Sequence, residues 1–316
     1  MIFKMGLITS SWRQQVSMNY LRLKCQPSYI KVKSSLRQRA FITSSSPKHN
    51  EKKTHFGFET ISEAEKESRV AGVFSSVATS YDTMNDFMSL GIHRLWKDYF
   101  VRSINPGFSS HSPKRPWTML DIAGGTGDIA FRLLAHSDEI NDSPESTVTI
   151  SDINPDMLVE GRKRSLATPY ANSSRLKFLL ANAEHLDEIP SDSIDLYTVA
   201  FGIRNFTNKE AALAEAYRVL RPGGLFACLE FSQVTNPVFN SIYKRWSFGA
   251  IPLIGQLISG DRASYQYLVE SIERFPKKED FRDMIQTAGF EVPVNGWENL
   301  TGGIAAIHKG VKPVSC

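Results

Sequence analysis

The strongest constraint on the fold is a regular alternation of short apolar segments and helical segments that begins at residue 118. Apolar runs predict strands at Thr118–Ala123, Thr147–Ile150, Leu176–Leu180, Ser193–Ala200 and Leu225–Phe231, and the segments between them predict helices at Asp128–Ala135, Pro155–Leu166 and Lys209–Leu220. Repeated strand-then-helix units are typical of an α/β fold with a doubly wound, mostly parallel sheet and helices on both faces.

The segments before and after this alternation are less regular. A predicted helix at Asp280–Ala288 precedes two predicted strands, Glu291–Trp297 and Gly303–His308, and two adjacent strands without a helix between them predict an antiparallel hairpin at the sheet edge. Toward the N-terminus, Ala71–Ser80 and Leu90–Ile104 are predicted helices, Lys52–Ser68 a polar loop that leads into helix, and Asn105–Pro116 a surface insertion.

Composition narrows the class of protein. Of the 316 residues, 41% are hydrophobic and 22% are charged, which favours a globular core over extended disorder. Three cysteines cannot form a disulfide framework, and no CxxC pair suggests zinc. No apolar run approaches the roughly 20 residues that a membrane-spanning helix needs.

The basic charge is concentrated at the N-terminus. Residues 1–46 hold eight of the 37 basic residues and none of the 33 acidic ones, so the remainder carries 29 basic and 33 acidic residues. An arginine-rich, serine-rich and acid-poor segment is typical of a mitochondrial transit peptide, and we expect 1–46 to be a disordered, cleaved leader. The alternative is a basic tail that binds RNA or anionic lipid. We expect no nucleic-acid partner, because such a protein should keep its basic patch in the folded body.

Polar and glycine residues follow successive predicted strands. The first strand ends in a loop, Asp121–Asp128, that contains Gly124, Gly125, Thr126 and Gly127, and the next two strands end near Asp152 and near Asn182 and Ala183. Glycines let a backbone approach a ligand closely, and an acid at the second strand can accept hydrogen bonds from ribose hydroxyls. Asp121 can attract the ammonium group of an amino-acid-bearing ligand. Each acid could instead be a helix cap or a solvated turn residue, and a nicotinamide dehydrogenase is a rival reading of the loop.

Together these residues resemble a class I S-adenosylmethionine-dependent methyltransferase. Tyr81–Trp96, Phe201–Asn205 and Arg218–Ser232 further resemble signatures of the ubiquinone/menaquinone biosynthesis C-methyltransferase family, and the resemblance runs from about Thr54 to Gly310. It implies a Rossmann-like, seven-stranded sheet in one domain over 47–316, with a helical lid over about 54–104. One departure is Ala200, where bacterial members often have a serine assigned to the cofactor site.

The resemblance also implies an activity. With the leader, it implies that S-adenosylmethionine is the cosubstrate for C-methylation of 2-methoxy-6-polyprenyl-1,4-benzoquinol in ubiquinone biosynthesis. A non-catalytic scaffold with the same fold is the alternative. Methyl transfer to carbon needs no metal, and no His, Asp or Cys cluster in the sequence has metal-ligand spacing.

Four residues are candidates for the chemistry on the quinol. By the resemblance, Arg204 and Asn205 face the substrate, and the Arg204 guanidinium could stabilise a phenolate. His93 could accept a proton at neutral pH or could be a packing histidine. Tyr81 could line the quinol site or bury its ring in the lid. We expect Glu230 to be a buried structural acid.

The polyprenyl tail needs an apolar route. Ile242–Ile258 is rich in apolar residues and has no charge between Arg245 and Asp261. It could form a lid that rests on a membrane, a dimer contact or a core helix. The resemblance implies a peripheral protein on the matrix side of the mitochondrial inner membrane, within a ubiquinone-biosynthesis complex, and a homodimer is a further option.

Overall fold

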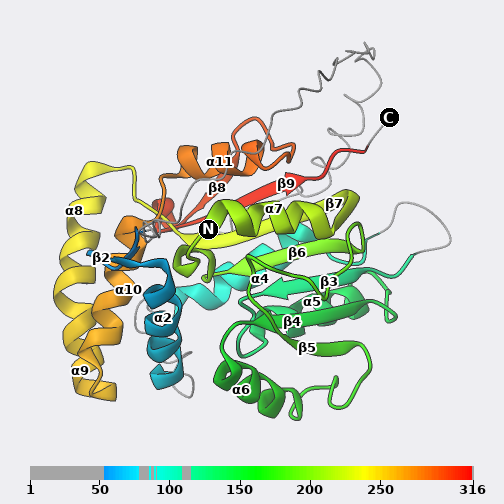
Figure 1. The fold of residues 1–316 in the computed structure, drawn as a ribbon, viewed down its shortest axis with the longest axis horizontal. Helices are drawn as coiled ribbons and strands as arrows, with labels where there is room; N and C mark the ends of the chain where they lie inside the picture. Colours follow the sequence, from blue (N-terminus) through cyan, green and yellow to red (C-terminus); the bar gives the residue numbers. More distant parts are fainter. Residues whose placement is uncertain (1–52, 78–84, 87–88, 90, 109–114, 315–316) are drawn as a thin grey trace, which may run out of the picture. The chain divides into compact units, whose positions relative to one another are not determined.

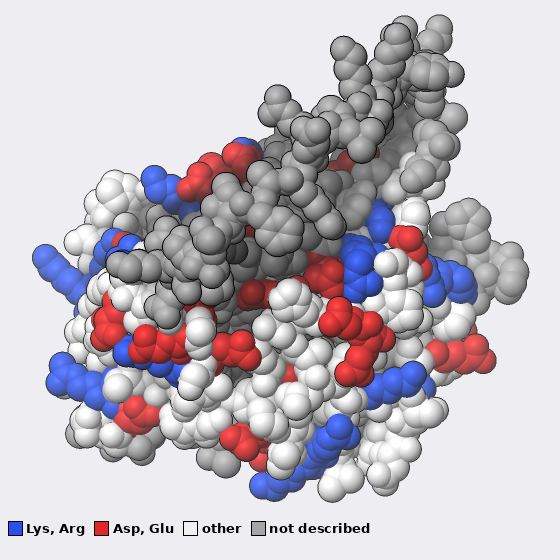
Figure 2. All heavy atoms as spheres, viewed as in Figure 1, with Lys and Arg blue, Asp and Glu red and all other residues white. Residues whose placement is uncertain are grey.

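The computed structural model describes residues 53–77, 85–86, 89, 91–108 and 115–314 (Figure 1). One compact unit spans Glu51–Cys316, and the predicted leader at 1–46 lies outside the described residues. Acidic and basic side chains are intermingled over the described part of the face shown in Figure 2. Among the described residues, no helix is both long enough and apolar enough to cross a membrane.

A seven-stranded sheet forms the centre of the fold, as predicted. Its order is β5-β4-β3-β6-β7-β9-β8, with the bounds Leu176–Leu180, Thr147–Asp152, Thr118–Ile122, Ile194–Ala200, Leu220–Phe231, Ala305–Val311 and Trp297–Leu300. The first five strands are parallel, whereas β9 is antiparallel to both β7 and β8. The antiparallel hairpin at the sheet edge is therefore confirmed.

Helices cover both faces of the sheet. The elements α5 (Asp128–Glu139), α6 (Pro155–Ser165) and α7 (Lys209–Val219) connect parallel strands, while α4 (Ile92–Ile104) precedes the sheet and α11 (Lys278–Thr287) precedes the final hairpin. Right-handed crossovers place α5 and α6 on one face and α7 on the other. Contacts add α4 beside α5 and α11 beside α7. The core on the α7 side includes the fully buried rings of Tyr197, Phe226 and Phe281.

A cap of helices and a small hairpin lies at one side of the sheet (left in Figure 1). It comprises β1 (Lys53–Phe56), β2 (Glu59–Ser62), α2 (Glu63–Val77), α8 (Pro237–Arg245), the π-helical turn η4 (Trp246–Ala250), α9 (Ile251–Ser259) and α10 (Arg262–Arg274). The rings of Phe56 and Tyr267 stack at 4.2 Å and join β1 to α10. Lys66 Nζ donates to the Phe206 carbonyl oxygen at 3.0 Å and ties α2 to the segment that follows β6.

Three predicted boundaries are wrong. The predicted loop at Lys52–Ser68 is, over its described residues 53–68, a hairpin followed by helix, because the β1–β2 pairing and the packing on α10 are tertiary contacts. The first C-terminal strand is Trp297–Leu300 rather than Glu291–Trp297, because Pro293 and Gly296 form a turn and Gly296 has a φ of 72°. Strand β7 begins at Leu220, five residues earlier than predicted, and continues through Gly223 and Gly224.

Candidate active site

The carboxyl ends of β3, β4, β5 and β6 surround a large cavity. The chain leaves β3 for β4 and β5 and then returns to β6 on the other side of β3, so the strand order reverses between β3 and β6. Ligands in open α/β sheets bind at this reversal. The cavity measures about 1090 Å³ including its open mouth, and α2 forms part of its wall. It is large enough for a nucleoside that carries an amino acid.

The glycine loop after β3 forms one wall of the cavity. Its backbone takes left-handed conformations at Ala123, Gly125 and Gly127, with φ values of 50°, 49° and 86°. The left-handed conformation favours glycine at Gly125, where an added Cβ atom would also press on the flexible end of Met157, 2.8 Å from Cε. Ala123 holds this conformation with a side chain, which is typical of strained functional loops. Predicted Gly124, Gly125 and Thr126 line the cavity, while Gly127 is the N-cap residue of α5.

Asp121 is a buried carboxylate with one oxygen that lacks a partner. The residue is 1% exposed, and its Oδ1 accepts a hydrogen bond from Thr198 Oγ1 at 2.7 Å across β3 and β6. Its Oδ2 is buried and has no hydrogen-bond partner among the described residues. Burial, together with the nearby carboxylates of Asp128 and Asp152, raises the pKa of Asp121 to about 7. A cationic ligand group in the cavity would offset the free-energy cost of burying the Asp121 carboxylate.

Asp152 holds the loop and lines the same cavity at the end of β4. Its Oδ2 accepts from the Gly125 amide at 3.0 Å, and its Oδ1 accepts from the Asn154 amide at 2.9 Å. Burial raises the pKa of Asp152 to about 6 despite these bonds. Asn154 caps α6 and also donates to the Ala71 carbonyl oxygen at 3.1 Å, which joins this strand end to α2.

The predicted residues after β5 and β6 also line the cavity. Asn182, Ala183 and Ala200 are all in its wall, and Asn182 Oδ1 accepts from the Glu184 amide at 2.9 Å. Because Ala200 lines the wall, a serine there would present a hydroxyl to the ligand, and this chain lacks that contact. Phe201, with a φ of 57°, turns the backbone sharply at the end of β6.

Asn205 combines burial, access to the cavity and an unused donor. It lies in a short 3-10 turn, η3 (Ile203–Asn205), is 8% exposed and lines the cavity. Its Oδ1 accepts from the Tyr267 hydroxyl of α10 at 2.9 Å, and its buried Nδ2 has no partner among the described residues. Tyr267 therefore orients an amide whose donor is left for a ligand.

Arg204 lies beside Asn205 but does not line the cavity. Its guanidinium is fully buried and forms an ion pair with Glu230 at 2.8 Å. It also donates to the Phe201 carbonyl oxygen and to Ser271 Oγ. These bonds hold η3 against β7 and α10, so in this conformation Arg204 positions the turn that carries Asn205. Glu230 is a buried, paired acid.

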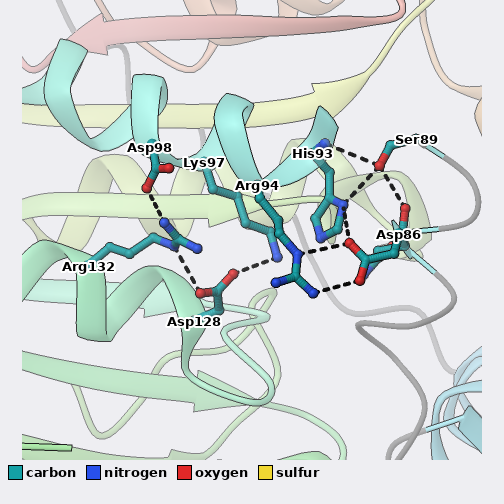
Figure 3. Close-up of polar contacts among 9 residues, drawn as sticks. Asp86, Ser89, His93, Arg94, Lys97, Asp98, Asp128 and Arg132 are labelled. Atoms are coloured by element: carbon teal, nitrogen blue, oxygen red, sulfur yellow. Dashed lines mark hydrogen bonds and ion pairs between the residues drawn. The ribbon is translucent and has the colours of Figure 1, made fainter. Parts of the chain in front are cut away.

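His93 is buried in α4, away from the cavity wall. Its Nδ1 lies 2.9 Å from Ser89 Oγ and 3.6 Å from Asp86 Oδ1, as Figure 3 shows. This arrangement suits a packing histidine. Tyr81, the fourth catalytic candidate, lies outside the described residues.

Sequence reasoning missed three residues that shape the site. Phe74 of α2 and Lys97 of α4 line the cavity, and Tyr267 holds Asn205. The sequence could have indicated Lys97, because it is a charged residue on the apolar face of its helix, between Trp96 and Phe100.

Among the described residues no cluster of His, Cys, Asp or Glu could hold a metal ion.

The site suits a ligand with a nucleoside at one end and an amino acid at the other. Asp152 can accept from ribose hydroxyls, the glycine loop leaves room for the ligand chain, and the unpartnered oxygen of Asp121 suits an ammonium group. With the doubly wound sheet, these features define a class I S-adenosylmethionine-dependent methyltransferase.

Comparison with known proteins gives the family. The chain belongs to the ubiE/COQ5 methyltransferase family, whose model matches residues 62–312. It is 55% identical to a Schizosaccharomyces pombe protein named 2-methoxy-6-polyprenyl-1,4-benzoquinol methylase, mitochondrial, over 82% of this chain and 84% of that one. A Dictyostelium discoideum protein of the same name is 47% identical over 85% of this chain and 90% of that one. The ubiquinone/menaquinone biosynthesis C-methyltransferase UbiE of Brucella anthropi is 51% identical over 81% and 92%.

Solved structures agree on the fold. The [4+2]-cyclase SpnF superposes with a TM-score of 0.54 at 15% identity, over 79% of this chain and 97% of that one. A possible histamine N-methyltransferase from Thermotoga maritima superposes with a TM-score of 0.51 at 18% identity, over 76% and 98%. These similarities concern the fold alone, because the two proteins are named for different reactions.

The raised pKa of Asp121 predicts how cosubstrate binding depends on pH. A bound ammonium group favours the ionised carboxylate, so below a pKa of about 7 binding must release a proton. Affinity for S-adenosylhomocysteine should therefore fall as pH drops below 7, by up to about tenfold per unit, and level off above about pH 8. Calorimetric titrations between pH 6 and 8.5 measure this.

Two variants decide whether Asp121 is the titrating group. Asp121→Asn should bind more weakly at pH 8 and lose the pH dependence. Asp156→Asn, which changes an exposed carboxylate in the first turn of α6, is the control and should keep the wild-type profile. An unchanged profile in Asp121→Asn would contradict the assignment.

Proposed function

We propose that the chain transfers the methyl group of S-adenosylmethionine to a ring carbon of 2-methoxy-6-polyprenyl-1,4-benzoquinol in ubiquinone biosynthesis. The observation that carries this proposal is that one cavity is lined both by the carboxylates of Asp121 and Asp152 and by aromatic rings together with Asn205, whose Nδ2 has no partner among the described residues. The names of relatives at 47–55% identity supply the substrate.

The aromatic part of the lining suits a flat, oxygen-bearing ring. Phe201 and Phe206 come from the same segment after β6 as Asn205, and Phe74 of α2 lines the same cavity. A quinol ring can pack against these side chains, while a quinol oxygen accepts a hydrogen bond from Asn205 Nδ2. Such a bond strengthens as negative charge grows on that oxygen.

The reaction forms one carbon–carbon bond and breaks one carbon–sulfur bond. The ring carbon attacks the sulfonium methyl in line, S-adenosylhomocysteine leaves, and the attacked carbon then loses its proton, so the ring regains aromaticity. Holding the methyl group and the carbon close and collinear accounts for much of the acceleration. The buried Arg204–Glu230 pair supports a positioning role for Arg204. Direct stabilisation of a phenolate by Arg204, and proton acceptance by His93 or Tyr81, stay predictions.

Product analysis tests the proposal. The enzyme is incubated with methyl-labelled S-adenosylmethionine and a short-tailed quinol that has the methoxy group but lacks the ring methyl. We expect the label on a ring carbon. Label on oxygen would contradict C-methylation, and cosubstrate binding without any transfer would favour the scaffold alternative.

Tyr267→Phe tests the acceptor end. Loss of the hydroxyl leaves the Asn205 amide without its orienting donor, so kcat with the quinol should fall about tenfold, in line with one hydrogen bond of about 1.5 kcal/mol. The Kd of S-adenosylhomocysteine should not change. Tyr265→Phe, on the same helix, is the matched control and should keep wild-type kcat. Equal loss in both variants would show that the effect is only structural.

The helices α8 and α9 are proposed as a membrane-facing surface that admits the polyprenyl tail. No side chain of α8 is buried, and Val238 and Ile242 are 70% and 62% exposed. Arg245 in its last turn suits anionic headgroups, while Lys244 is paired with Glu273 at 2.6 Å. The same face could instead form a homodimer contact.

Vesicle sedimentation distinguishes the two uses of this surface. The double variant Val238→Ser, Ile242→Ser should sediment severalfold less with anionic vesicles than the wild type and keep its oligomeric state. Val159→Ser, which changes an exposed valine of α6, is the control. Unchanged sedimentation with a loss of dimer would contradict the membrane proposal.

The setting is the mitochondrion, on the matrix side of the inner membrane, within a complex of ubiquinone-biosynthesis proteins. The basic leader composition and the word mitochondrial in the names of eukaryotic relatives support this proposal.

A further inference from the structure

Lys97 is a buried cation on the wall of an otherwise acidic cavity. It is 4% exposed, and it is the one basic residue among the described residues that line the cavity. The acidic residues of the same wall are Glu67, Asp121, Asp128, Asp152 and Glu184. A single ammonium group among these carboxylates marks where a negatively charged ligand group could bind.

The Asp128 carboxylate does not depend on Lys97 alone. Lys97 Nζ donates to Asp128 Oδ2 at 2.7 Å, and Arg132 Nε donates to Asp128 Oδ1 at 2.9 Å. Arg132 also pairs with Asp98, and Figure 3 shows the four side chains in one row between α4 and α5. Burial alone would raise the pKa of Asp128, but the two cations outweigh it and lower that pKa.

The N–H donors of Lys97 that Asp128 does not use are available to a ligand in the cavity. An ammonium group has three N–H donors, and among the described residues Asp128 is the one hydrogen-bond partner of Lys97. Asp128 and Ile129, in the first turn of α5, line the cavity beside it. The positive end of this twelve-residue helix favours an anion at the same place.

The charges of the cosubstrate match this wall. S-adenosylmethionine has a sulfonium and an ammonium group, which suit the carboxylates, and one carboxylate, which needs a cation. We propose that Lys97 binds the carboxylate of the methionine part of S-adenosylmethionine. The proposal rests on the proposed S-adenosylmethionine-dependent function and assigns a residue to the amino-acid end of the ligand.

A matched pair of ligands tests the proposal by binding alone. S-adenosylhomocysteine carries the carboxylate, and S-adenosyl-3-thiopropylamine lacks only that group. The wild type should prefer the former. Lys97→Met should weaken binding of S-adenosylhomocysteine by ~10–100-fold, as expected for a lost charged hydrogen bond, and change binding of the amine by less than about twofold. Lys97→Gln, checked for folding by circular dichroism, is the second variant with the same expectation.

The control separates this role from a structural one. Arg132→Gln disturbs the same charge cluster without changing a residue of the cavity wall, and it should keep the preference for the carboxylate-bearing ligand. Equal weakening of both ligands by Lys97→Met would overturn the proposal, because Lys97 would then act only through Asp128. Unchanged binding with a reduced kcat would also overturn it and place Lys97 at the quinol. Failure of the wild type to bind either ligand would instead count against the proposed function.

Discussion

The site depends on a carboxylate buried at the end of the central strand. Asp121 lies on β3, one of the two strands that flank the reversal in strand order, and pairs with Ile150 of β4 and Thr198 of β6. A protein interior disfavours such a charge unless it is paired, and here one oxygen has a hydroxyl donor and the other has none among the described residues. The fold thus keeps an energetically unfavourable buried carboxylate at a place where a cationic ligand group can pair with it.

The two halves of the proposed reaction come from different parts of the chain. The cosubstrate end is built by the parallel strands, whose aligned carboxyl ends bring the glycine loop, Asp152 and Asn182 together. The proposed acceptor end is built around Asn205, which Tyr267 of α10 in the cap holds. The buried Arg204–Glu230 pair joins η3 to β7, so it fixes one half relative to the other.

The sequence predicted the parts of this structure that local pattern controls. Strands β3 to β6 and the residues at their ends follow from apolar runs and glycines. All of the predicted cosubstrate residues except Gly127 line the cavity, and Gly127 caps α5. The β1–β2 hairpin could not be predicted, because its partners lie on α10, more than two hundred residues away. The helical pattern marks Lys97 as a charged residue on an apolar face but does not report its contact with Asp128 of α5, and the contact of Tyr267 with Asn205 joins residues 62 positions apart.

The most direct test is a crystal structure of the enzyme with S-adenosylhomocysteine. The account predicts the ribose hydroxyls on Asp152, the adenine beside Asn182 and Ala183, and the ammonium group near Asp121 Oδ2. A ligand bound elsewhere, or one reversed in the cavity with its amino acid at Asp152, would contradict the account.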